Sequence, residues 1–303
     1  ELYAILVDAL CRSLRLFERS LSQKTEPLSS PKLFHFAPPI LGHFFTLIYL
    51  SKDDDDSLEQ ERKKFHKYLS LSMERPVFRR SNAFMFQDNI AANAPLINPH
   101  EALHASVKDG VASLVYGRYS YHHYMQDRMD DNGWGCAYRS LQTLISWFRH
   151  QGYTDRPIPT HREIQQCLVD IGDKDKSFVG SNKWIGSTEV SFCLDTMLGI
   201  SSRILNVSSG AELAEKGSEL SQHFQIHGTP IMIGGGVLAH TILGVDYNRE
   251  TGELKFLVLD PHYTGSEDLK FIQQKGWVGW KKIDFWSKNS YYNLCMPIRP
   301  HCI

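Results

Sequence analysis

The feature that most constrains this chain is the segment 131–140, Asp-Asn-Gly-Trp-Gly-Cys-Ala-Tyr-Arg-Ser, in which two glycines precede a cysteine at the start of an apolar helical pattern. Apolar residues recur at helical spacing from Cys136 to Phe148, and Gly152 is a suitable stop. A helix N-terminus favours an anion, which lowers the pKa of a thiol placed there. Cys136 is therefore a candidate nucleophile, although these ten residues alone also fit an ordinary buried thiol.

Length, charge and cysteine usage restrict the class of protein. At 303 residues the chain is long enough for a catalytic domain and a smaller companion. The formal net charge of −1 gives no reason to expect nucleic acid or an anionic membrane surface as the main partner. The six cysteines form no C-x-x-C pair, so we expect a reducing cytosolic compartment, no metal and no cofactor.

The N-terminal part, residues 1–94, is predicted to be a small α/β domain. It contains an amphipathic helix over residues 1–21, a strand over 44–50 and a helix introduced by Ser57 and Gln60 in capping-box form. The longest apolar stretch, residues 40–50, is too short to span a membrane. Because the chain starts with a glutamate in mid-helix, we expect this domain to be N-terminally truncated.

Residues 95–303 are predicted to form the larger, catalytic domain. Helices are expected from Cys136, from His161 with Thr160 as its cap, from Ser187 as a cap, and over residues 211–227. Strands are expected over residues 203–207, 230–233, 240–247, 254–260 and 291–296. Because strands 240–247 and 254–260 are apolar on both faces, they belong in the centre of a covered sheet. The fold class is therefore α+β, with the cysteine-bearing helix packed on a mostly antiparallel sheet.

A nucleophilic cysteine needs a base and a group that orients the base, and Asp260-Pro261-His262 supplies both. Residues two apart on an extended backbone point to the same side, and Pro261 favours that conformation for Asp260. Asp-Pro-His is common by chance, so its weight comes from the combination with Cys136. His240 is a rival base, to which we assign a secondary role because no carboxylate is adjacent to it in sequence.

Two further features bear on substrate binding and on the oxyanion. Gly234, Gly235 and Gly236 do not fit a nucleotide-binding pattern, and favour a close-approach or mobile loop over a narrow cleft for a chain of small residues, although a plain strand-joining turn fits nearly as well. An oxyanion formed at the scissile carbonyl needs hydrogen-bond donors. The N–H of Cys136 is one candidate, and a phenol in the segment 119–124 is another.

Five segments together resemble the ubiquitin-fold modifier 1-specific proteases, and among them the longer, type 2 group. They are Tyr-His-His-Tyr-Met-Gln-Asp-Arg at 121–128, the cysteine segment at 131–140, Trp-Ile-Gly-Ser at 184–187, Gly-Gly-Gly-Val-Leu-Ala-His-Thr at 234–241 and Leu-Asp-Pro-His-Tyr-Thr-Gly at 259–265. The resemblance implies a papain-like fold. It also implies that Cys136, Asp260 and His262 form a catalytic triad, with Tyr124 as the side-chain oxyanion donor.

The resemblance further implies cleavage after the terminal glycine of ubiquitin-fold modifier 1 (Ufm1), both in its precursor and in its lysine-linked conjugates. Trp134, the three glycines and His240 are then expected to line the substrate cleft. In the type 2 group the N-terminal part implies recruitment to the endoplasmic reticulum surface through an adaptor. The alternatives are an autophagin acting on an autophagy modifier, a catalytically idle modifier-binding scaffold, and a cysteine acyltransferase.

Overall fold

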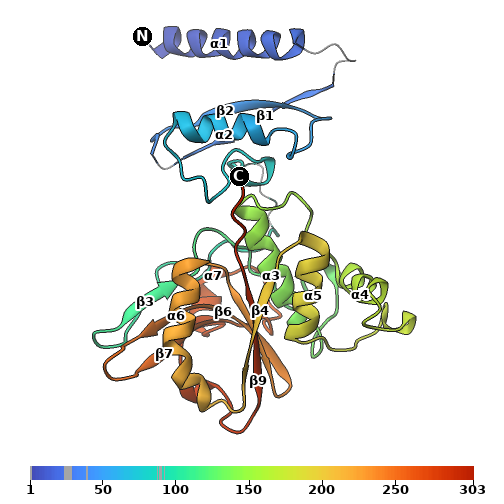
Figure 1. Ribbon diagram of the computed structural model, residues 1–303, viewed down its shortest axis with the longest axis vertical. Coiled ribbons are helices and arrows are strands. Elements are labelled where there is room, and N and C mark those ends of the chain that lie inside the picture. Colours follow the sequence, from blue (N-terminus) through green and yellow to red (C-terminus); the bar gives the residue numbers. More distant parts are fainter. Residues whose placement is uncertain (1, 24–28, 39, 87, 89–90, 92) are drawn as a thin grey trace. The chain divides into compact units, whose positions relative to one another are not determined.

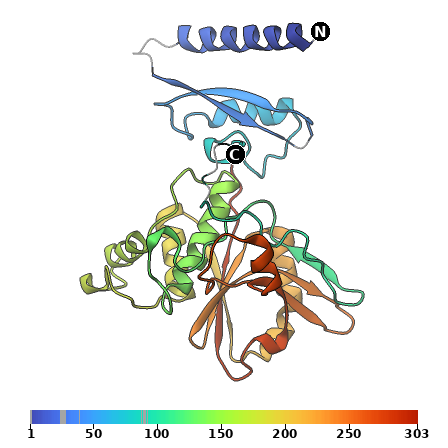
Figure 2. The ribbon, with the colours of Figure 1, turned by 180° about the vertical axis from the view of Figure 1, so that it is seen from behind.

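The computed structural model describes residues 2–23, 29–38, 40–86, 88, 91 and 93–303 (Figures 1 and 2). The chain divides into two compact units, one comprising Glu1–Met85 with Ile303, the other Phe86–Cys302. This division lies somewhat before the domain boundary predicted at residue 94. Each unit has its own core, so the two are described separately.

The N-terminal unit is a small α/β structure built on one hairpin. Strand β1 (Pro31–Phe36) pairs antiparallel with β2 (Phe45–Leu50). The core of the unit is formed by Phe36, Tyr49 and Phe78. Its helices are α1 (Leu2–Ser22), α2 (Glu59–Tyr68) and the short 3₁₀ helix η1 (Arg80–Asn82).

The larger unit is organised around one seven-stranded sheet in which every pairing is antiparallel. The strand order is β4-β9-β5-β6-β7-β8, and β3 pairs with β6 outside this path. The strands are β3 (Val111–Leu114), β4 (Ser202–Val207), β5 (Ile231–Gly235), β6 (Leu238–Tyr247), β7 (Leu254–Leu259), β8 (Val278–Lys282) and β9 (Tyr292–Pro297).

Helices cover both faces of this sheet (Figure 1). One core lies under α3 (Cys136–His150), α4 (His161–Asp170) and α5 (Ser187–Leu198), and takes Leu257 and Leu259 from β7. The other lies under α6 (Gly217–Ile226), and takes Phe256 and Val258 from the same strand. This alternation with a period of two confirms the prediction of a central strand buried on both faces. The remaining short helices are η3 (Gln126–Arg128), η4 (Lys176–Phe178), η5 (Glu212–Lys216), α7 (Leu269–Gln274) and η6 (Ile283–Phe285).

The α+β architecture is as predicted, but several local expectations were wrong. Helix α2 begins at Glu59 with Leu58 as its N-cap and no side-chain cap, so Ser57 and Gln60 form no capping box. Ser187 is the first residue of α5, and Gly186 is the cap. The predicted helix 211–227 is divided into η5 and α6. Strands β1, β3 and β8 and helix α7 were not predicted.

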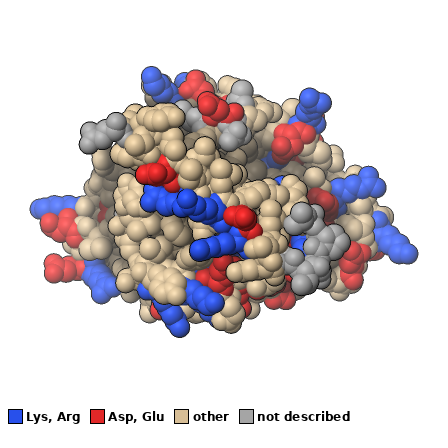
Figure 3. Space-filling model, turned by 90° about the horizontal axis from the view of Figure 1, so that it is seen from above, with Lys and Arg blue, Asp and Glu red and all other residues tan. Residues whose placement is uncertain are grey.

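The charges on the surface are mixed in sign. On the face drawn in Figure 3, basic and acidic side chains lie beside one another over much of the area. Among the helices that the structure describes, none is long and apolar enough to cross a membrane.

Candidate active site

Cys136 lies at the first position of α3, where the helix packs against β5 and β6. Gly135 is the N-cap of this helix, and a Cβ at that position would lie 2.5 Å from Oδ2 of Asp131. Gly133 has a φ of +82°, a left-handed conformation that favours glycine. The Gly-Trp-Gly sequence is thus required by a tight turn that places the thiol at the helix N-terminus with 8% of its surface exposed.

Asp131 stabilises this turn through both its backbone carbonyl and its side chain. Its backbone carbonyl accepts hydrogen bonds from the N–H groups of Trp134 (3.2 Å) and Gly135 (2.9 Å). Its buried carboxylate accepts from Nε of Arg139 at 2.6 Å and pairs with Nε2 of His161 at 2.9 Å. The carboxylate therefore ties the cysteine turn to α3 and α4, and these bonds hold the pKa of Asp131 below its usual value despite burial.

Asp260 and His262 follow the last residue of β7, at the edge of the sheet that faces the start of α3. The N–H of Asp260 donates to the carbonyl of Trp277 at 2.8 Å, which holds the strand end in place. His262 Nδ1 lies 2.6 Å from Oδ1 of Asp260, and the N–H of His262 donates to the same oxygen at 2.9 Å. Asp260 and His262 are therefore neighbours, as predicted, but residues 261 and 262 lie in a turn and not on an extended backbone.

The thiol and the imidazole shift each other toward their charged forms. Burial alone would raise the pKa of Cys136, but the interactions with His262 and with the backbone of Ala239 outweigh it, so the thiol pKa is lowered. Burial would lower the pKa of His262, but the hydrogen bond to Asp260 and the interaction with Cys136 raise that pKa to about 9. With Nδ1 bonded to Asp260, Nε2 is the nitrogen left for the thiol. The arrangement therefore favours a thiolate–imidazolium pair.

Tyr124 is brought to the same point from a segment outside the sheet. Its ring lies perpendicular to that of His262, with 5.3 Å between the centroids, and its hydroxyl interacts with Cys136. Burial and the neighbouring thiol raise the pKa of Tyr124, so the phenol keeps its proton and can donate it in a hydrogen bond. The structure thus singles out Tyr124 from the tyrosines at 119 and 121, which spacing alone does not do.

A cavity of about 470 Å³ runs from Cys136 along the end of β5. Four of the predicted cleft residues line it: Trp134, Gly234, Gly235 and Gly236. The glycines are not a free loop, because Gly234 and Gly235 are paired in β5 and only Gly236, with a φ of +59°, lies in the turn. A Cβ on Gly235 would overlap the ring of Tyr292, so the cavity wall here is bare backbone.

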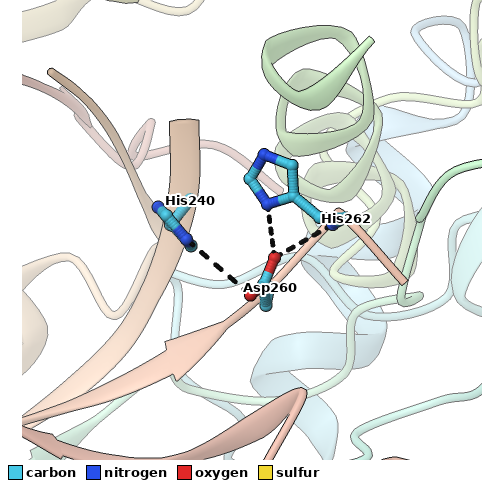
Figure 4. Close-up of side chains that lie close together, drawn as sticks. All are labelled: His240, Asp260 and His262. Carbon is cyan, nitrogen blue, oxygen red and sulfur yellow. Dashed lines mark hydrogen bonds and ion pairs between the residues drawn. The ribbon is translucent and has the colours of Figure 1, made fainter. Parts of the chain in front are cut away.

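His240 lies apart from that cavity. It lines a second cavity of about 450 Å³ together with Asp260 and His262, on the other side of the β5–β6 turn. Figure 4 shows the Asp260 carboxylate between the two imidazoles, with Nε2 of His240 3.8 Å from Oδ2. Burial lowers the pKa of His240 to about 4, so its ring is neutral near pH 7. Nothing in the sequence indicates this carboxylate neighbour, which arises from the pairing of β6 with β7.

Among the described residues, His240, Asp260 and His262 are the one group of three potential metal ligands, with donor atoms within 4.8 Å of one another. The hydrogen bonds from His262 to Asp260 account for their closeness. A role for Asp131 was missed in the sequence, although an aspartate that opens the Asn-Gly turn before the cysteine was a usable signal. His161, its partner in space, carried no such signal.

Comparisons with known proteins identify the relatives of this chain. Models of peptidase family C78 and of the N-terminal region of ubiquitin-fold modifier 1 specific protease 2 match residues 110–295 and 1–91. A probable Ufm1-specific protease 2 of Drosophila melanogaster is 55% identical over 310 residues, covering 99% of this chain and 51% of the relative. Ufm1-specific protease 2 of Homo sapiens is 54% identical over 302 residues, covering 99% and 64%.

The crystal structure of UfSP from C. elegans has a TM-score of 0.79 and 46% sequence identity, and the match covers 90% of this chain and 51% of that one. The chain therefore spans about half the length of the fly relative and less than two thirds of the human one. These matches confirm the resemblance drawn from the sequence, and they favour it over the autophagin alternative.

Proposed function

Because the chain belongs to peptidase family C78, we propose that it is a thiol peptidase that cleaves after the C-terminal glycine of Ufm1. In this proposal Cys136, His262 and Asp260 form the catalytic triad. The observation that carries it is the Cys136 thiol beside an imidazole whose other nitrogen is bonded to Asp260 at 2.6 Å. The same site would mature the Ufm1 precursor and release Ufm1 from target lysines.

The proposed reaction starts from the thiolate of Cys136 and the imidazolium of His262. The thiolate attacks the carbonyl carbon of the terminal glycine, and the resulting oxyanion accepts hydrogen bonds from the Tyr124 hydroxyl and the N–H of Cys136. His262 then gives its proton to the leaving amine, and a thioester remains on the enzyme. Neutral His262 takes a proton from the water that attacks this thioester, which frees the glycine carboxylate and restores the thiol site.

The cavity beside Cys136 supports a substrate tail of small residues. Its wall at Gly234 and Gly235 is backbone, and the rings of Trp134 and Trp184 lie among its other lining residues. A chain that ends in glycine can pass close to such a wall, whereas a bulky side chain meets it. We assign His240 a secondary role. It is the neutral neighbour of Asp260, and we propose that it lies on the side of His262 that faces the leaving group.

We propose that the enzyme works in the cytoplasm. We also propose that its N-terminal unit recruits it to the endoplasmic reticulum surface through an adaptor. The match of residues 1–91 to the N-terminal region of the type 2 proteases supports this assignment. Cys11, Cys136, Cys167, Cys193 and Cys295 are free thiols, which suits a reducing compartment. Fractionation of cells expressing the chain with and without residues 1–85 tests it, since loss of membrane association is expected only without them.

The test of the activity uses purified chain and tail-bearing precursors of Ufm1, ubiquitin and an autophagy modifier, with products identified by mass. We expect cleavage at the glycine of the Ufm1 precursor alone, and none by Cys136→Ser. Binding of Ufm1 without cleavage would support the idle scaffold, and transfer of Ufm1 to an added amine in place of hydrolysis would identify an acyltransferase.

A further inference from the structure

A buried histidine beside the catalytic groups has no part in the mechanism above. His123 directly precedes Tyr124, and its side chain is 1% exposed. Its Nδ1 lies 2.9 Å from the carbonyl oxygen of Tyr124 and 3.1 Å from that of Tyr263, the residue that follows His262. A single ring nitrogen therefore touches the backbone of both the tyrosine segment and the Asp-Pro-His segment.

The opposite nitrogen is held by a carboxylate. His123 Nε2 lies 2.9 Å from Oε1 of Glu267, and the Gln126 side-chain amide donates to the same oxygen at 2.6 Å. The second carboxylate oxygen accepts from the N–H of Leu96 at 3.3 Å. Since carbonyl oxygens only accept, the Nδ1 that contacts two of them is the donor, and Nε2 faces the carboxylate of Glu267. His123 is thus fixed at both ends of its ring.

Further hydrogen bonds join the segment that carries Tyr124 to the Asp-Pro-His segment. The N–H of Tyr124 donates to the carbonyl of Pro261 at 2.9 Å, and the Tyr121 hydroxyl donates to the carbonyl of Asp260. The His123 ring also packs against Tyr263, with centroids 4.9 Å apart. The carbonyls of residues 260, 261 and 263 are therefore all bound by the segment that carries Tyr124.

We propose that His123, held by Glu267, is a positioning residue that sets the place of Tyr124 relative to His262. The side chains of His123 and Glu267 do not touch the thiol. They act through the backbone next to Tyr124 and His262, the two residues whose side chains do. A shift of about 1 Å in a reacting group can cost roughly a hundredfold in rate, so a bond that fixes two such groups at once has a measurable effect. This inference rests on the proposed peptidase function.

The main variant is His123→Phe, which keeps a ring and removes both ring nitrogens. We expect kcat for the Ufm1 precursor to fall about ten- to hundredfold while KM stays within about twofold, because the substrate cavity lies elsewhere. The pH profile of the rate of Cys136 alkylation by iodoacetamide (the alkylation profile) should shift to higher pH, since His262 is no longer held against the thiol. Glu267→Gln should shift it in the same direction by less.

His223→Phe is the matched control. His223 is also buried and hydrogen-bonded, to Thr229, but it lies on α6 at the other face of the sheet. It should lower thermal stability without moving the alkylation profile. A double-mutant cycle adds a second readout, because the loss caused by His123→Phe should shrink in a Tyr124→Phe background.

An unchanged kcat in His123→Phe, or an alkylation profile that moves no more than that of His223→Phe, overturns the proposal. Glu267→Gln provides the same test if His123→Phe does not fold. The alkylation comparison needs no substrate, so it decides the positioning role even if the chain fails to cleave the Ufm1 precursor.

Discussion

Asp260 is the carboxylate that charges His262. Burial works against a charged His262, and Asp260 supplies the largest opposing contribution, so that the imidazole pKa is raised from 6.5 to about 9. A shift of that size corresponds to about 3 kcal/mol in favour of the imidazolium, or roughly a three-hundredfold change in the ratio of imidazolium to neutral imidazole at a given pH. Asp260→Asn removes the carboxylate at nearly constant size, so we expect a ten- to hundredfold loss of the thiolate–imidazolium pair near pH 7.

The assay is the pH dependence of Cys136 alkylation, mapped by mass so that the accessible thiols of Cys11 and Cys302 do not contribute. In the native chain the rate should rise well below pH 9, the ordinary thiol value, because the thiol pKa is lowered. Peptidase activity should fall as pH rises through about 9, where His262 loses the proton that the leaving amine needs.

In Asp260→Asn the alkylation profile should move to higher pH, and the rate at pH 7 should drop by the factor given above. Asp195→Asn, at an exposed position on α5, is the control and should leave the profile in place. If the profiles of Asp260→Asn and the native chain coincide, the carboxylate does not stabilise the imidazolium and the reasoning is refuted.

Three further substitutions give separate expectations. Tyr124→Phe should lower kcat about a hundred- to a thousandfold with little change in the affinity of Cys136→Ser for Ufm1, as measured by calorimetry, and an unchanged rate would assign the oxyanion to backbone donors alone. Gly235→Ala should raise KM or block cleavage, because the added methyl group meets the ring of Tyr292 behind the cavity wall and so displaces the end of β5 that lines the cavity beside Cys136; wild-type kinetics would show that the ring can yield. Asp131→Asn should reduce the free energy of unfolding by about 3 kcal/mol in urea titrations, because it leaves the buried Arg139 guanidinium poorly compensated, and a loss below about 1 kcal/mol would contradict this.

The parts of the fold that the sequence predicted are those with a strong local or periodic signal. The glycines before Cys136 and the apolar spacing after it mark the start of α3, because a tight turn and a buried helix leave little choice of residue. The strands β6 and β7 are apolar on both faces, which few structures other than a covered sheet can use. The nearness of Asp260 and His262 could be predicted because residues two apart on an extended backbone point to the same side.

What the sequence could not show depends on contacts between distant segments. The nearness of His240 to Asp260 requires the pairing of β6 with β7, and the link from Asp131 to His161 requires α4 to pack beside the cysteine turn. The glycine run predicts a close-approach or mobile loop, or a strand-joining turn, yet Gly234 and Gly235 are paired with β6 and β9 as part of β5, and only Gly236 lies in the turn. Ser57 and Gln60 had the right spacing for a cap, but α2 begins beyond Ser57.

The position of the base after β7 has a consequence for the newly made chain. Cys136 is synthesised well before His262, and the carboxylate that charges the imidazole directly precedes it on the same segment. Until β7 has joined the sheet, the thiol lacks the partner that lowers its pKa and resembles any other cysteine. The nascent chain therefore carries a thiol of ordinary pKa on the ribosome, and its reactivity toward electrophiles increases when β7 has joined the sheet and His262 reaches it.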